Sequence, residues 1–241
     1  MSSKCALIIG AGDSTGAAVA RAFAADGLVA CCVRRDGAKV NELVESIRAE
    51  GYRAEGFGVD CRDEENVQGL VNDIETKFGP IEVAVFNVGA NVRFPITETT
   101  SRVYRKVWEM ACFSGFLVGR EVAARMAPRR RGTIIFTGAT ASVRGSAHFA
   151  AFSSAKFGLR ALSQSMAREL GPEGIHVAHL IVDGAIDTPW IHENFPQAKE
   201  KQEQEGLVDP TDIAKMYVQL HHQPKTAWTH ELDVRPWVEK W

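Results

Sequence analysis

Short apolar runs alternate with amphipathic helical patterns along the chain, and this alternation restricts the fold more than any other feature of the sequence. Ala6-Leu7-Ile8-Ile9 is typical of a strand buried on both faces, and apolar residues recur at helical spacing over 40–47. Further strands are expected at 28–33, 57–59, 81–86, 133–137 and 175–182, and further helices at 16–25, 67–78, 100–127 and 150–171. Because the connections are too long for hairpins, we predict an α/β fold, a parallel sheet with helices on both faces, as one domain over residues 1–241.

The composition is that of an ordinary globular protein without a strong charge. Of the 241 residues 45% are apolar and 24% are charged, and the net charge of −2 gives no electrostatic argument for nucleic acid. The run Arg129-Arg130-Arg131 is interpreted as a solvated turn between a helix and a strand. No apolar stretch reaches the roughly 18 residues of a membrane span. Neither nucleic acid nor a membrane is therefore expected as a partner.

The cysteines and the N-terminal sequence indicate the cellular compartment in which the protein is expected. The cysteines form no C-x-x-C pair, and three of them lie in or beside apolar runs, so we expect reduced, mostly buried thiols and no metal site. The N-terminus passes almost directly into a strand pattern and has no signal-peptide layout. A cytoplasmic protein is expected. The five cysteines are Cys5, Cys31, Cys32, Cys61 and Cys112.

A glycine-rich segment joins the first expected strand to the first expected helix. Its sequence is Gly10-Ala11-Gly12-Asp13-Ser14-Thr15-Gly16. Glycines at such a junction allow a tight turn and a close approach of the backbone, so that a pyrophosphate can lie on the helix N-terminus. We therefore predict a dinucleotide site. Its expected contacts from this loop are Gly10, Gly12, Ser14, Thr15 and Gly16.

Two arginines at the end of the second expected strand bear on which dinucleotide is bound. In folds of this kind that position faces the adenosine ribose, and an acidic residue there pairs with the free 2′-hydroxyl of NAD. This chain has Arg34 and Arg35 instead, and guanidinium groups suit a 2′-phosphate, so NADP is favoured over NAD. The alternative is that both arginines point into solvent, in which case Asp13 or Asp36 would weaken the preference.

Taken together with later motifs in the same order, the chain resembles the classical short-chain dehydrogenase/reductase family over roughly residues 5–235. The family pattern Thr-Gly-x-x-x-Gly-x-Gly falls on 9–16, with Ser14 in place of the middle glycine. Val59-Asp60, Phe86-Asn87-Val88-Gly89 and the segment 183–189 match further motifs, with Asp183 in place of a proline. The resemblance implies a Rossmann-type doubly wound sheet. It also implies cofactor contacts from Asp60, Asn87, Gly89, Gly184, Ile186 and Thr188.

The same resemblance places the catalytic tetrad, and three of its four positions are changed. Phe152-Ser153-Ser154-Ala155-Lys156 stands where the family has Tyr-x-x-x-Lys, so the lysine that holds the nicotinamide ribose is kept as Lys156. Phe152 occupies the tyrosine position, Ala139 the serine position and Cys112 the asparagine position. A positioned general acid or base contributes about 10²–10⁴ in rate. The usual carbonyl reduction is therefore not expected.

Two functions of different classes remain open, and we favour the first. One is an NADP(H)-dependent oxidoreductase acting on an unknown small carbonyl or hydroxyl compound, with the proton carried by a surrogate. His148, one helical turn before Phe152 if the helix extends that far, or a bound water would be that surrogate. The other is an inactive NADP(H)-binding protein that acts as a sensor, a scaffold or the partner of an active subunit.

Two segments outside the sheet pattern are also assigned. Residues 185–206 are polar and poor in strand pattern, and we expect them to form a lid over the ligand crevice, a solvated surface helix being the alternative. The resemblance implies a homodimer or homotetramer. The tail 225–241 carries Trp228, Trp237 and Trp241, which we expect to be buried at a subunit contact or against the core.

Overall fold

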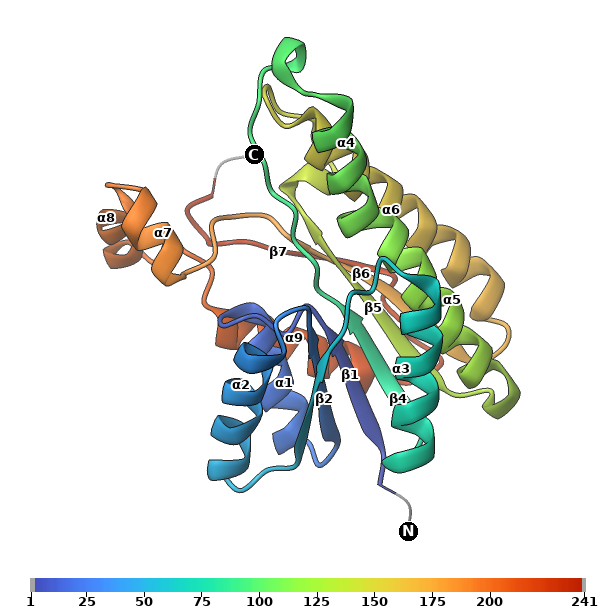
Figure 1. Ribbon diagram of the computed structural model, residues 1–241. Helices are drawn as coiled ribbons and strands as arrows, with labels where there is room; N and C mark the ends of the chain where they lie inside the picture. The colour runs from blue at the N-terminus through green and yellow to red at the C-terminus, as the bar shows by residue number, and fades with distance from the viewer. Residues whose placement is uncertain (1–2, 240–241) are drawn as a thin grey trace.

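Seven parallel strands form one sheet in the order β3-β2-β1-β4-β5-β6-β7 in the computed structural model, which describes residues 3–239 (Figure 1). Every neighbouring pair is parallel, as predicted from the long connections. The order reverses at β1, which lies between β2 and β4. The strands are β1 (Cys5–Ile9), β2 (Val29–Arg34), β3 (Ala54–Gly58), β4 (Ile81–Phe86), β5 (Gly132–Ala139), β6 (Ile175–Val182) and β7 (Glu231–Val234).

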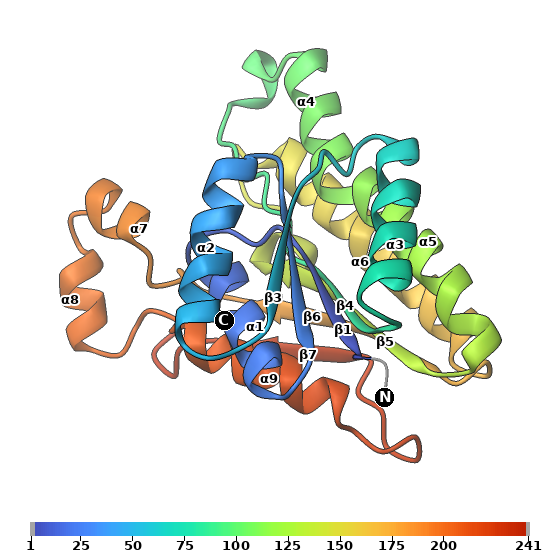
Figure 2. The ribbon, with the colours of Figure 1, turned by 60° about the horizontal axis from the view of Figure 1, so that its bottom comes forward.

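Helices cover both faces of the sheet and bury two separate apolar cores (Figure 2). One face is covered by α1 (Thr15–Ala25), α2 (Gly37–Ala49) and α9 (Pro210–His221), and the other by α3 (Glu64–Lys77), α5 (Ser114–Met126) and α6 (Ala150–Leu170). Aspartate side chains cap α2, α3 and α9, because each accepts a backbone N–H of the first turn. The predicted fold class is confirmed.

A π-helical turn interrupts the long helical segment that was expected at 100–127. α4 (Ser101–Trp108) passes into the π-turn Glu109–Phe113, which leads directly into α5. Such turns are rare and are frequent at functional sites. Cys112 lies in this turn and is buried with a third, smaller apolar cluster that also includes Phe152.

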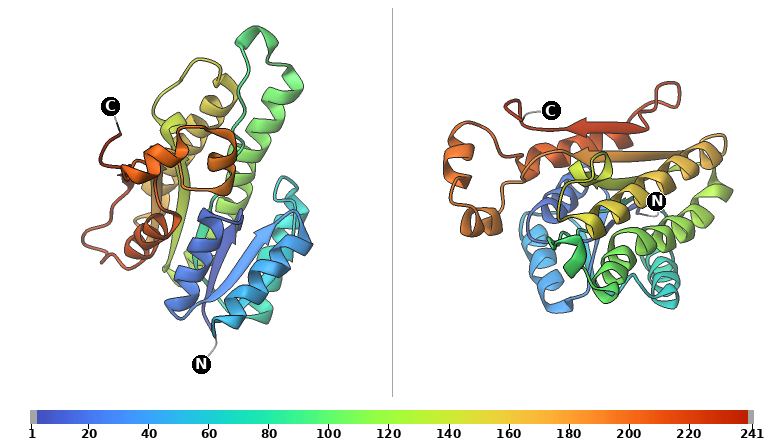
Figure 3. Two further views of the ribbon diagram at one scale, coloured as in Figure 1. Left: turned by 90° about the vertical axis from the view of Figure 1, so that its left-hand side faces the viewer. Right: turned by 90° about the horizontal axis from the view of Figure 1, so that it is seen from above.

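Residues 185–206 form two short helices that stand away from the rest of the molecule (Figure 3). These are α7 (Pro189–Asn194) and α8 (Ala198–Glu203). Trp190 and Phe195 contact each other edge to face at 5.6 Å between ring centroids, and both are exposed. The segment begins beside β6, where Ile186 bridges to Val208. Its role as a lid stays a prediction.

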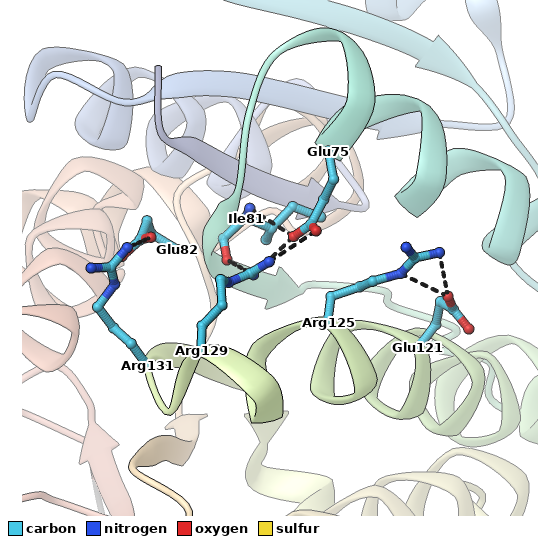
Figure 4. Close-up of polar contacts among 7 residues, drawn as sticks. All are labelled: Glu75, Ile81, Glu82, Glu121, Arg125, Arg129 and Arg131. Atoms are coloured by element: carbon cyan, nitrogen blue, oxygen red, sulfur yellow. Dashed lines mark hydrogen bonds and ion pairs between the residues drawn. The ribbon is translucent and has the colours of Figure 1, made fainter. Parts of the chain in front are cut away.

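The arginine run 129–131 lies between a helix and a strand, as predicted, and Arg130 and Arg131 are more than half exposed, but all three side chains pair with carboxylates and Arg129 is mostly buried. The Arg129 guanidinium donates to both carboxylate oxygens of Glu75, at 2.8 and 2.9 Å, and to the Ile81 carbonyl at 3.2 Å (Figure 4). The side chains of Arg129 and Glu75 are only 27% and 15% exposed. Arg131 pairs with Glu82 at 2.6 Å. These bonds connect the turn after α5 to the last part of α3 and to the start of β4.

The tail follows the edge of the sheet as β7, a strand that we did not predict. Trp228 is half-buried and stacks on His176 at 4.9 Å, with the ring planes 1° apart. Trp237 is 78% exposed, so within the chain it is not buried against the core. Trp241 lies outside the described residues. All five cysteines are buried and free.

Candidate functional site

Two adjoining cavities open at the carboxyl ends of the central strands, where the strand order reverses. The glycine-loop cavity, of about 490 Å³, is lined by the loop 10–16, the end of β2, residues 59–62 and the segment 87–89. The Lys156 cavity, of about 410 Å³, is lined by residues 137–141, the start of α6, the end of β6 and the same segment 87–89. Ligands of open parallel sheets bind in this crevice. The shared wall allows one extended ligand to occupy both cavities.

The backbone of the glycine loop explains why glycine is needed at two of its positions. Gly10 has φ +84°, and a Cβ there would lie 2.3 Å from the Asn87 carbonyl oxygen. A Cβ on Gly16 would lie 2.3 Å from the Gly10 carbonyl oxygen. Gly12 is different, since a Cβ there would meet no atom closer than 4.0 Å. Gly12 lines the cavity. The protein backbone would tolerate a side chain at this position, but that side chain would occupy space in the cavity that a ligand can fill.

The N-terminus of α1 is directed at this cavity. Its N-cap residue Ser14 makes no side-chain capping bond, and Ser14, Thr15 and Gly16 all line the cavity wall. The first N–H groups of a helix carry partial positive charge and bind anions. Together with the open space at Gly12, this arrangement fits the pyrophosphate of a dinucleotide.

The outer wall of the glycine-loop cavity is rich in charge. Arg34 pairs with Asp13 at 2.7 Å and is 19% exposed, whereas Asp13 is 74% exposed. Arg35 is exposed and also lines the cavity. The Arg62 guanidinium donates hydrogen bonds to the Asp60 carboxylate, and these bonds lower the pKa of that carboxyl. Three guanidinium groups and two carboxylates therefore border this wall. Both arginines that the sequence singled out face the cavity, and the contribution of Arg62 was missed.

Lys156 lines the Lys156 cavity and is buried. Its Nζ donates to the Thr137 carbonyl at 2.8 Å and to the Val88 carbonyl at 3.1 Å. Burial lowers the pKa of this ammonium to about 8, an effect that Cys112 partly opposes. Nζ is also 5.9 Å from the centroid of the Phe152 ring. The ammonium is thus fixed beside the segment 87–89 that both cavities share.

The positions that the resemblance assigns to proton transfer lie in different places. Phe152 and Ala139 line the Lys156 cavity and contribute no titratable group. Cys112 is not among the residues that line either cavity; burial raises the pKa of its thiol, and its Sγ would lie 2.9 Å from a Cβ on Gly158. Among these three side chains none offers a proton to the cavity near neutral pH.

The structure does not bring His148 into the site. α6 begins at Ala150, so the helical turn that would align His148 with Phe152 does not exist. His148 is exposed, adopts a left-handed backbone with φ +71°, and is not among the residues that line the cavity. Its carbonyl accepts a hydrogen bond from the Phe94 N–H at 2.9 Å. The residue joins two loops at the mouth of the site and is not placed to donate a proton inside it.

The remaining predicted cofactor residues differ in which cavity they line. Asn87 and Gly89 line both cavities, and the Asn87 side chain donates to the Gly10 carbonyl at 3.2 Å. Gly184 and Ile186 line the Lys156 cavity. Thr188 caps α7 by accepting the Ile191 N–H at 3.2 Å and lines neither cavity.

A polar contact that the sequence reasoning missed lies at the ends of β5 and β6. The Thr140 hydroxyl donates to the Asp183 carboxylate at 2.5 Å, and Asp183 also pairs with Arg235 at 3.3 Å. Asp183 in place of the proline of the family motif was the one available indication. Within residues 3–239, no cluster of His, Cys, Asp and Glu could hold a metal ion. In the same range, no helix is long and apolar enough to cross a bilayer.

Comparison with known proteins agrees with this geometry. A short chain dehydrogenase family model matches residues 4–199. The chain is 28% identical over 228 residues to 2-dehydro-3-deoxy-D-gluconate 5-dehydrogenase of Formosa agariphila (88% of this chain, 83% of that protein). It is 30% identical over 230 residues to 2,3-dihydro-2,3-dihydroxybenzoate dehydrogenase of Bacillus subtilis (88% and 86%). The crystal structure of a short-chain dehydrogenase from Rhodopseudomonas palustris superposes with a TM-score of 0.83 at 48% identity and covers 97% of this chain and 99% of that one. The chain belongs to the short-chain dehydrogenase family.

Proposed function

We propose that the chain is an NADP(H)-dependent oxidoreductase that interconverts a small alcohol and its carbonyl compound without the tyrosine of its family. The observation that carries this proposal is the pair of cavities that share the wall 87–89 beside the buried Lys156. A nicotinamide dinucleotide supplies hydride exchange when it is bound. The glycine loop would hold its pyrophosphate, and Lys156 its nicotinamide ribose.

The preference for NADP over NAD is supported by the arginines at the end of β2. Arg35 lines the cavity and is exposed, which leaves its guanidinium accessible to a ligand phosphate. Arg34 already pairs with Asp13 at 2.7 Å, so part of its charge is balanced. A planar guanidinium group can bind a phosphate through two parallel, bidentate hydrogen bonds. We therefore assign the 2′-phosphate mainly to Arg35.

The lining of the Lys156 cavity supports a compact, largely apolar substrate with one anionic group. Phe149, Phe152 and Ile186 provide apolar surface. Arg144 also lines the cavity, is exposed, and forms no ion pair with any residue between 3 and 239. The Formosa agariphila and Bacillus subtilis relatives are named for a gluconate and a benzoate, both carboxylates. A hydroxy acid or keto acid with a small ring or short chain fits this cavity.

An inactive NADP(H)-binding protein is the second candidate, and a specific observation favours it. Phe152 and Ala139 line the cavity at the positions where the family resemblance expects a tyrosine and a serine. Both candidates predict cofactor binding, and they differ in turnover.

One set of measurements tests the proposal. NADPH and NADH affinities are compared by fluorescence titration for the wild type, for Arg35→Ala and for Arg168→Ala, an exposed arginine at the far end of α6. One lost charge-assisted contact of about 1.5–3 kcal/mol should weaken NADPH binding about 10–100-fold in Arg35→Ala alone. Turnover is then measured with NADP⁺ and NADPH on a panel of cyclic and short-chain hydroxy and keto acids. Tight NADPH binding with no turnover on the whole panel would favour the inactive candidate.

We also propose that the protein assembles as a homodimer or homotetramer. The supporting observation is a row of stacked aromatic rings on the surface of α4, the π-turn and α5. Trp108 stacks on Phe113 at 5.5 Å, Phe113 stacks on Phe116 at 6.1 Å, and Trp108 and Phe116 are exposed. Replacing Phe116 with serine should shift the mass measured by light scattering toward the monomer, whereas Phe195→Ser, directly after α7, should not. A wild type that is monomeric at all concentrations would refute this proposal.

A further inference from the structure

Three neighbouring strands place three polar residues side by side at the edge of the Lys156 cavity. Ala139 of β5 pairs with Val182 of β6, and Val182 pairs with Val234 of β7. The residue that follows each of them is therefore adjacent to the next. These residues are Thr140, Asp183 and Arg235, and they form the row Thr140–Asp183–Arg235.

Thr140 is the member of this row that faces the substrate side. It is half-buried and begins the short turn Thr140–Ser142 directly after Ala139, and it lines the Lys156 cavity. Its Oγ1 donates to Asp183 Oδ1 at 2.5 Å. When a hydroxyl donates its hydrogen to a carboxylate, the lone pairs of its oxygen remain available to accept a proton from a ligand.

Asp183 is buried and fixed from three directions. Its Oδ1 accepts from Thr140, its Oδ2 lies 3.3 Å from the Arg235 guanidinium, and its backbone N–H donates to the Val234 carbonyl at 2.9 Å. The Asp183 carboxylate also borders a further cleft, of about 380 Å³, which lies beside the end of β6 and β7 and is distinct from the two cavities described above. Thr140 lines that cleft as well as the Lys156 cavity. The row therefore connects the cavity to a separate opening.

The other hydroxyls near the cavity have no such acceptor. The Thr137 hydroxyl is bound to the buried Tyr217 hydroxyl at 2.6 Å. Ser153 is buried with an Oγ that has no hydrogen-bond partner among residues 3–239, and Ser146 is exposed. Thr140 is thus the hydroxyl of the cavity wall that is paired with a carboxylate.

We propose that Thr140 and Asp183 carry the proton that the family tyrosine would carry, an inference that rests on the proposed function. In alcohol oxidation the substrate C–H hydride goes to the oxidised nicotinamide cofactor, and the substrate O–H proton goes to Thr140 Oγ1. The proton that Thr140 held moves to Asp183 Oδ1, so the products are a ketone or aldehyde, the reduced cofactor and a protonated Asp183. The proton then leaves to water in the cleft beside β7. Carbonyl reduction is the same sequence reversed.

Four variants test this relay on whichever hydroxy acid of the panel turns over with NADP⁺. Thr140→Val removes the hydroxyl and keeps the shape, and Asp183→Asn keeps a hydrogen-bond acceptor that cannot take the proton. We expect each to lower kcat about 10²–10⁴-fold while KM and NADPH affinity change little. Thr140→Ser, which restores the hydroxyl, should recover most of the activity, and Ser165→Ala, at an exposed position of α6 away from the cavity, should resemble the wild type.

A second readout does not depend on turnover. Infrared spectra of the cofactor-free protein, with the Asp183 carboxylate band assigned through Asp183→Asn, should show that band shifted in Thr140→Val and unshifted in Thr140→Ser. Should Asp183→Asn fail to fold because Arg235 loses one of its carboxylate partners, the kcat of Thr140→Val decides alone. A folded Thr140→Val variant with wild-type kcat would overturn the relay and leave the proposed function intact. A wild type that binds NADPH and turns over nothing would overturn both.

Discussion

Replacing Lys156 with methionine should change how the stability of the cofactor-free protein depends on pH. The wild-type ammonium is fully buried, and its burial lowers the pKa from 10.5 to about 8. Each pH unit of such a difference corresponds to about 1.4 kcal/mol, so keeping the charge in the folded state costs about 3 kcal/mol at neutral pH. Methionine has nearly the same shape and carries no charge.

The direction follows from proton linkage. Between pH 8 and 10.5 the lysine is protonated in the unfolded chain and neutral in the folded one, so the unfolded state binds more protons and wild-type stability rises with pH. The buried thiols act in the opposite sense, because burial raises the pKa of Cys32 and of Cys61 to about 12. Their contribution is lost as the pH rises above 9, and it is common to both proteins. The difference between the two curves therefore isolates Lys156 together with its interaction with the Cys112 thiol.

The measurement is urea unfolding of wild type and Lys156→Met from pH 7 to 10.5, with a thiol reductant and without NADP(H). The free energy of unfolding of the wild type minus that of Lys156→Met should rise by up to about 3 kcal/mol across this range. Lys199→Met, on the exposed side of α8, is the matched control and should give a flat difference. A flat difference for Lys156→Met as well would refute the reasoning, because it would mean that the ammonium is not desolvated in the folded state.

Two further predictions follow from the site and from the arginine run. The double variant Phe152→Tyr, Ala139→Ser should raise NADPH-dependent carbonyl reduction about 10²–10⁴-fold, because both side chains line the cavity beside Lys156; unchanged rates with intact NADPH binding would contradict this. Arg129→Ala should lower the free energy of urea unfolding by about 1–3 kcal/mol, because its carboxylate partner stays half-buried without a counter-charge. A loss no larger than that of Arg168→Ala would show that the pair contributes nothing.

The parts of the fold that could be predicted are those determined by local sequence. β4 and β6 were placed at their observed bounds, because each is a predominantly apolar stretch, as a buried parallel strand requires. β3 begins three residues before its predicted start and overlaps the predicted range 57–59, since Ala54–Gly58 contains two glycines and a glutamate and has no apolar run. β7 was missed because Glu231 and Asp233 alternate with apolar residues over only four positions. Its pairing with β6 is decided by tertiary contacts.

The same distinction applies to the site. The glycine loop is contiguous, so its chemistry could be deduced from the sequence alone. The Thr140–Asp183 bond joins residues 43 positions apart, and it depends on the register between β5 and β6, which no local pattern fixes. His148 was proposed on an assumed start of α6, and helix starts are uncertain by a few residues in any reading of a sequence. The helix begins at Ala150, as the pattern itself indicated, so the further turn that His148 needed is not there.

Lys156 is retained although its family partner, the tyrosine, is absent, and its contacts give a reason that does not involve proton transfer. The ammonium donates to the carbonyls of Val88, just after β4, and of Thr137, near the end of β5. Without it, both carbonyls would lose a charge-assisted bond in a buried site, at a cost of about 1–3 kcal/mol each. The lysine thus fixes the shared wall between the two cavities as well as any bound ribose. The presence of Lys156 is therefore evidence for a preserved cofactor site. Whether the chain catalyses a reaction depends on a different pair of groups, the Thr140 hydroxyl and the Asp183 carboxylate, and on whether they transfer a proton.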